Sequence, residues 1–125
     1  MRTLILLLAL SLPALAQSPN WKLWGASVAA YGAGTTYDAW STYQVVDVDR
    51  TAIELNPLIV RLTGSPHRFG APGFAVKGVL FGAMVIPQYF VVRKYPKAAK
   101  WFSILNFGGA ALYTGTAMHN MTFAK

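Results

Sequence analysis

Long apolar stretches, separated by short polar segments, make up most of the chain after residue 20. The three stretches run from about residue 23 to 46, from 73 to 92 and from 101 to 121. Each approaches the ~20 residues that an α-helix needs to cross a bilayer. Aromatic residues gather near their ends, as they do at membrane–water interfaces. The pattern predicts an all-α fold, an integral membrane bundle of three transmembrane helices in one domain over residues 17–125.

The first sixteen residues have the pattern of a secretory signal. Arg2 precedes a short apolar run over 4–12, which Pro13 and the small-residue segment Ala14-Leu15-Ala16 follow. The run is too short for a span, and we expect cleavage after Ala16. The alternative is an uncleaved N-terminal anchor.

A cleaved signal would place the mature N-terminus outside a multi-pass protein, which we expect in a bacterial inner membrane. The 47–72 loop would then be cytoplasmic and the 93–100 loop external. Basic residues are divided almost evenly between the two sides. The positive-inside rule therefore leans only slightly, toward the opposite orientation, and we let the signal decide.

The segment between the first two spans predicts a short interfacial helix. Two helix starts compete there: Thr51-x-x-Glu54 has capping-box spacing, and Asn56-Pro57 reads as an N-cap followed by proline at the first helical position. A short apolar turn follows, and the Thr-Gly-Ser-Pro run at 63–66 ends it.

Composition agrees with a membrane protein. The chain is 54% hydrophobic and only 12% charged, whereas soluble domains average about 25% charged residues. It has no cysteine, which excludes disulfides and thiolate metal sites. The net charge of +7 suits anionic headgroups. Nucleic acid is a poor alternative, because the basic residues are scattered around apolar spans.

A carboxylate, Asp38, lies inside the first stretch, on a helix face rich in hydroxyl groups. A charge at such a depth is costly and needs a partner in the bundle interior. Asp38 lies about 11 Å from the end of its span, and Lys77 lies about 6 Å into the second span from the same membrane face. The lysine stem can cover the difference, so we expect a salt bridge between them.

Other polar residues could join this pair in one pocket. The candidates share its end of the bundle: Thr42, Glu54, Asn56, His119 and Asn120. Asp38, Glu54 and His119 could in principle ligate a metal, but no metal-ligand spacing supports this, and we expect neither a metal nor a cofactor. The segment Asp47-Val48-Asp49 could hold a cation, although a solvated acidic turn is the simpler interpretation.

Small residues at four-residue spacing occur in two spans, as Ala26-xxx-Ala30-xxx-Gly34 in the first and Gly78-xxx-Gly82 in the second. Such spacing lets a second helix approach closely, and helix packing is its ordinary role.

Two short motifs also carry a resemblance. The run D-A-W-S-T-Y at Asp38, followed by E-L-N-P-L at Glu54, resembles a family of small uncharacterised bacterial membrane proteins classed as a domain of unknown function. The resemblance would cover roughly residues 31–120. It implies no activity, but it does imply that the matching residues belong together: Asp38, Thr42, Glu54, Asn56, Pro57 and Lys77.

Three functions remain open from the sequence. The first is a non-enzymatic assembly or interaction protein whose polar cluster fixes helix packing, with the lipid bilayer and a second copy or a membrane protein as partners. The second is an element that binds or transports a proton, a cation or a lipid headgroup. The third, an intramembrane enzyme, has the least support, because no catalytic motif is present.

Overall fold

Three long helices and one short helix form the computed structural model, which describes residues 19–125. The helices are α2 Pro19–Tyr43, α3 Pro57–Thr63, α4 Gly70–Lys94 and α5 Ala98–Met121, and a π-helical turn, Gln44–Val48, extends α2. No strand occurs within residues 19–125. The all-α prediction is confirmed for this part of the chain, and the predicted signal at 1–16 lies outside it.

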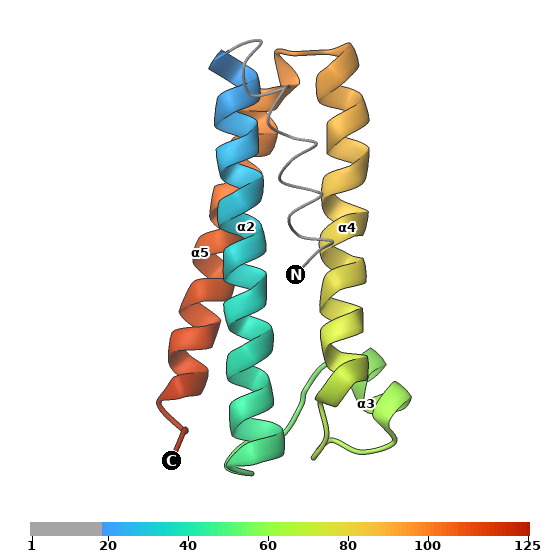
Figure 1. The fold of residues 1–125 in the computed structure, drawn as a ribbon, viewed down its shortest axis with the longest axis vertical. Helices are drawn as coiled ribbons and strands as arrows, with labels where there is room; N and C mark the ends of the chain where they lie inside the picture. The colour runs from blue at the N-terminus through green and yellow to red at the C-terminus, as the bar shows by residue number, and fades with distance from the viewer. Residues whose placement is uncertain (1–18) are drawn as a thin grey trace.

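The long helices run alternately along one axis (Figure 1). α2 and α5 point in the same direction and pack against each other extensively, whereas α4 runs in the opposite direction and contacts α2 less and α5 least. α3 lies beside the beginning of α4, at the end where α2 and α5 finish. The α4–α5 connection is at the opposite end of the bundle.

The helix boundaries follow the predicted spans with small differences. The largest is at the start of the first span, where α2 begins at Pro19 rather than at about residue 23. At the other end of this span, regular α-helix stops at Tyr43 rather than at residue 46. From there the backbone widens into the π-helical turn, in which the N–H of Asp49 donates to the carbonyl oxygen of Gln44 at 2.8 Å. The π-helix is rare, and it usually occurs as a single turn such as this one.

Only α4, among the helices of residues 19–125, is both long and apolar enough to cross a membrane by length and composition. Its most apolar segment has a mean hydropathy of 1.6, and only 17% of that segment is buried inside the protein. α2 and α5 have sufficient length, at 25 and 24 residues. Hydroxyl, amide and glycine residues lower the mean hydropathy of α2 and α5. Hydropathy and length together therefore identify one candidate span, α4, and not three.

The short helix α3 begins where the Asn56-Pro57 signal predicts. Asn56 is the N-cap: its side-chain Oδ1 accepts a hydrogen bond from the N–H of Leu58 at 3.0 Å, and Pro57 occupies the first turn. Gly64 ends the helix at φ 74°, in the left-handed region that glycine adopts without strain. The Thr51-x-x-Glu54 alternative is wrong, because no helix begins at Thr51.

Close packing between α2 and α5 depends on glycine. A methyl group added to Gly34 would lie 2.9 Å from the carbonyl oxygen of Ala110, and Gly109 lies directly against the Tyr31 ring. Gly34, the last residue of the predicted small-residue spacing of α2, therefore has the expected packing role, whereas Ala26 is exposed. Gly78 and Gly82 of α4 have no atom of another helix within 4 Å in the described part of the chain.

Candidate functional site

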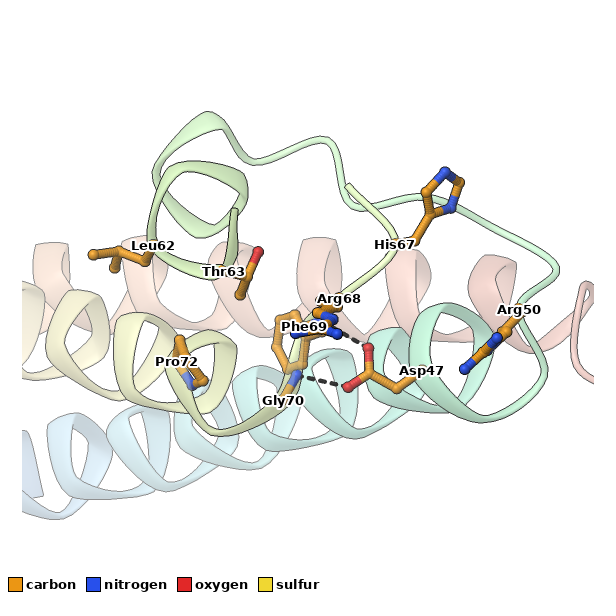
Figure 2. Close-up of a pocket in the computed structure, with 9 residues that line it drawn as sticks. All are labelled: Asp47, Arg50, Leu62, Thr63, His67, Arg68, Phe69, Gly70 and Pro72. Carbon is orange, nitrogen blue, oxygen red and sulfur yellow. Dashed lines mark hydrogen bonds between the residues drawn. The ribbon is translucent and has the colours of Figure 1, made fainter. Parts of the chain in front are cut away.

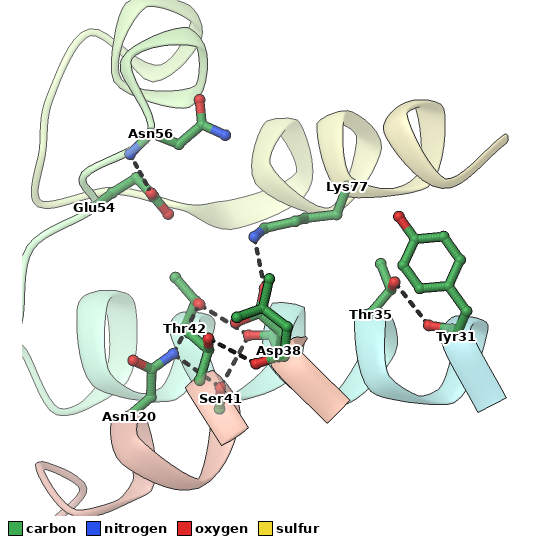
Figure 3. A network of polar contacts seen from close by, with 11 residues as sticks. Tyr31, Thr35, Asp38, Ser41, Thr42, Glu54, Asn56, Lys77 and Asn120 are labelled. Atoms are coloured by element: carbon green, nitrogen blue, oxygen red, sulfur yellow. Dashed lines mark hydrogen bonds and ion pairs between the residues drawn. The ribbon is translucent and has the colours of Figure 1, made fainter. Parts of the chain in front are cut away.

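The predicted salt bridge between Asp38 of α2 and Lys77 of α4 is present. Nζ of Lys77 lies 2.6 Å from Oδ2 of Asp38 (Figure 3). The Asp38 side chain is 2% exposed and that of Lys77 is 18% exposed. Lys77 also lies 5.4 Å from the centre of the Tyr113 ring, so α5 contributes to its surroundings. The pair thus neutralises two charges inside the bundle and joins α2 to α4.

The hydroxyl groups near Asp38 do not solvate its carboxylate. Ser41 and Thr42 donate to the backbone carbonyl oxygen of Asp38 at 2.9 and 2.8 Å. Thr35 makes the same kind of bond one turn earlier, to the carbonyl oxygen of Tyr31. Such bonds to a preceding turn are the usual way for a hydroxyl residue to satisfy its donor inside a helix. The carboxylate of Asp38 therefore depends on Lys77.

Asn120 attaches the end of α5 to the same region of α2. Its Nδ2 donates to Oγ of Ser41 at 3.1 Å and to Oγ1 of Thr42 at 3.2 Å (Figure 3). His119 does not join the cluster, because its side chain is exposed and its ring packs against Phe123. Successive helical residues point about 100° apart, so a helix that turns Asn120 toward α2 turns His119 away.

Glu54 and Asn56 form a separate polar pair on the loop. Oε1 of Glu54 accepts the backbone N–H of Asn56 at 2.6 Å, while the side chain of Asn56 caps α3. Glu54 is only 9% exposed, and its Oε2 has no hydrogen-bond partner among residues 19–125. No hydrogen bond joins this pair to Lys77 within the same residues. The residues predicted to form one pocket thus form separate groups. Asp38 bonds to Lys77, Asn120 bonds to Thr42, and Glu54 bonds to Asn56.

A second polar network, absent from the sequence prediction, lies toward the other end of the bundle. Gln88 of α4 and Asn106 of α5 exchange two side-chain hydrogen bonds, at 2.9 and 2.8 Å. Trp24 Nε1 donates to Gln88 at 3.0 Å, and Asn106 donates to the hydroxyl of Ser27 at 3.1 Å. All four residues are buried. Gln88 and Asn106 lie at similar depths on either side of the 93–100 loop, so the depth argument could have found them.

The two networks set the alignment of the helices. Ser27 bonds to Asn106 and Ser41 bonds to Asn120, each across a separation of 79 positions. The two bonds are fourteen residues apart on both helices. Fourteen residues are two heptads, so both bonds lie on the same face of each helix in a packed parallel pair. A slip of α5 along α2 by one turn would break both bonds at once.

A third site lies at the beginning of α4 (Figure 2). Asp47 accepts the backbone N–H groups of Phe69 and Gly70, at 2.7 and 2.8 Å. It therefore caps α4, because a helix N-terminus leaves donors that a carboxylate can satisfy. Asp49 accepts the backbone N–H of Lys125 at 2.9 Å. The interpretation of this segment as a merely solvated acidic turn is wrong.

A cavity of about 440 Å³ adjoins the Asp47 cap. Its lining comes from the π-helical turn, the loop, α3 and the start of α4: Asp47, Arg50, Leu62, Thr63, His67, Arg68, Phe69, Gly70 and Pro72. Neither Asp38 nor Lys77 lines it. Within residues 19–125, no group of three or more histidine, aspartate or glutamate residues is placed to hold a metal ion.

No protein-family model, curated protein or solved structure matches the chain. The resemblance based on the D-A-W-S-T-Y and E-L-N-P-L runs therefore stays a prediction, and the function is argued from the geometry alone.

Proposed function

We propose that the chain is a small, non-enzymatic integral membrane protein in which internal polar contacts hold three spans in fixed alignment, so that the outer faces can take part in a membrane assembly. The supporting observation is that the two charges within the long helices that face the bundle interior, Asp38 and Lys77, form a closed pair. An unpaired charge at the centre of a membrane helix costs at least ~2.5–3.5 kcal/mol on insertion scales.

The distribution of apolar surface supports a lipid environment for α4. Its large outward side chains are widely exposed: Val79 is 71% exposed, Ile86 60% and Phe90 62%. Contiguous apolar surface of this kind is rare on soluble monomers. α2 and α5 carry more polar residues, and several of these form hydrogen bonds between the two helices. Polar side chains in membrane bundles commonly bond between helices in this way.

Membrane location is tested by washing membranes that contain the full chain with alkaline carbonate. We expect the protein to stay in the pellet, whereas recovery in the supernatant would contradict the proposal. Orientation is tested with a single cysteine at Lys97, because the natural chain has no cysteine. The proposed external loop requires labelling of that cysteine by a membrane-impermeant reagent.

The assembly role is tested by measuring native mass in a mild detergent. The chain has a mass of 13.6 kDa, and we expect a stoichiometric particle heavier than one chain plus its micelle. A homogeneous monomer without a partner would contradict the assembly role and leave the membrane location standing.

The alternative of a proton- or cation-binding element is favoured by one observation, the buried and unpartnered Oε2 of Glu54. Glu54→Gln distinguishes the two functions, because the glutamine keeps a carbonyl oxygen to accept the Asn56 N–H. An assembly protein should keep its native mass and its thermal stability in this variant. The alternative would instead be supported if the thermal stability of the natural chain depends on the added ion and that of Glu54→Gln does not.

A further inference from the structure

The cavity beside the Asp47 cap carries an excess of positive charge. Two arginines, Arg50 and Arg68, line it with a single carboxylate (Figure 2). Both oxygens of that carboxylate already accept backbone N–H groups. Neither arginine forms an ion pair with another side chain among residues 19–125. Two guanidinium groups are thus available to an anion at this end of the bundle.

An apolar groove of about 260 Å³ adjoins this cavity. It runs between α3 and α4 and is lined only by apolar residues: Leu58, Leu62, Pro72, Ala75, Val76, Val79 and Leu80. Leu62 and Pro72 line both the groove and the basic cavity. The basic cavity and the apolar groove are therefore neighbours that share Leu62 and Pro72 in their walls.

We infer that the two cavities together form a binding site for an anionic phospholipid, with the phosphate in the basic cavity and an acyl chain along the groove. Guanidinium groups bind phosphate oxygens through paired, charge-assisted hydrogen bonds, and the groove offers an acyl chain an apolar surface. The inference rests on the proposed membrane location, since a lipid can reach the α3–α4 groove laterally only from a bilayer.

The site is tested by titrating the detergent-purified full chain with water-soluble dioctanoyl phosphatidylglycerol. Dioctanoyl phosphatidylcholine and inorganic phosphate serve as the comparison ligands. We expect phosphatidylglycerol to bind most tightly, and added salt to weaken its binding. Arg50→Gln and Arg68→Gln should each weaken binding by about fivefold.

Arg61→Gln is the matched control, because Arg61 is an exposed arginine of α3 that lines neither cavity. It should leave binding within about twofold of the natural chain, since exposed charges outside a contact contribute little. A second variant, Ala75→Trp, fills the groove from an exposed position. It should weaken phosphatidylglycerol binding and leave inorganic phosphate binding unchanged.

Three results would overturn the inference. These are equal losses in the Arg61 and Arg68 variants, equal affinity for the two lipids, and binding of inorganic phosphate with no gain from the acyl chains, which would make the site one for free phosphate.

A measurement on the natural chain avoids any folding defect in the variants. Phosphatidylglycerol should protect Arg50 and Arg68, but not Arg61, from modification by phenylglyoxal, as read by peptide mass spectrometry. Uniform modification of all three would also overturn the inference. The titration needs no bilayer, so it can succeed even if carbonate extraction contradicts the membrane location.

Discussion

The Asp38–Lys77 pair allows a quantitative test of how the bundle is held together. Among residues 19–125, the carboxylate of Asp38 bonds to Lys77 alone, because Ser41 and Thr42 donate to the backbone carbonyl of Asp38 and not to its side chain. Asp38→Asn and Lys77→Met therefore remove one partner each and leave the neighbouring hydroxyl bonds in place. The double variant removes both charges.

Exposure decides which single variant is worse. Lys77→Met leaves a carboxylate that is 2% exposed, whereas Asp38→Asn leaves an ammonium group that is 18% exposed and can reach water more easily. We expect a loss of about 3 kcal/mol in the free energy of unfolding for Lys77→Met and about 2 kcal/mol for Asp38→Asn. The double variant keeps only a poorly bonded amide and should lose about 2 kcal/mol.

The measurement is equilibrium unfolding in mixed micelles, followed by helical circular dichroism. The expected coupling is about 3 kcal/mol, at the upper end of the range for side chains in direct contact. Lys94→Met is the control, since Lys94 is an exposed lysine in the last turn of the same helix, and its effect should be within about 0.5 kcal/mol. A double variant that loses the sum of the two single effects, about 5 kcal/mol, would refute the reasoning.

Three further variants test the other contacts by thermal unfolding in detergent. Asn106→Leu should destabilise the protein by about 2 kcal/mol, because the buried Nε2 of Gln88 loses its acceptor; an unchanged Tm would contradict this. Gly34→Ala should destabilise by about 1–3 kcal/mol by forcing α2 from α5, whereas the control Gly108→Ala, which meets no atom within 4 Å in the described chain, should not lower the Tm. Asp47→Ala should cost about 1–2 kcal/mol through the lost cap, with faster hydrogen exchange in the first turn of α4.

Depth along the bundle was the strongest predictor in the sequence. It pairs Asp38 with Lys77, because antiparallel helices place residues at similar distances from a shared loop at the same level. The same rule applied to the 93–100 loop pairs Gln88 with Asn106. A buried amide requires its hydrogen bonds as a buried charge requires a partner, so the depth rule applies to both kinds of residue.

Helix rotation was harder to predict than depth. His119 and Asn120 have nearly the same depth, yet only Asn120 contacts α2. The choice between adjacent positions depends on which face of α5 packs against α2. That face is set by close contacts such as Gly34 against Ala110, and many small residues in both helices offer the same spacing. Gly78-xxx-Gly82 shows the ambiguity, since it has the same pattern without a helical neighbour in the described chain.

Matched spacing of polar residues could have resolved part of this ambiguity. Ser27 and Ser41 are separated by fourteen residues, as are Asn106 and Asn120. Likewise, Asp38 follows Ser27 by eleven residues, and Gln88 follows Lys77 by eleven, which is three turns of a helix. Two helices can satisfy buried groups at two levels simultaneously only if the spacings agree. Equal spacings therefore indicate which helices are neighbours, in a way that small-residue patterns alone cannot.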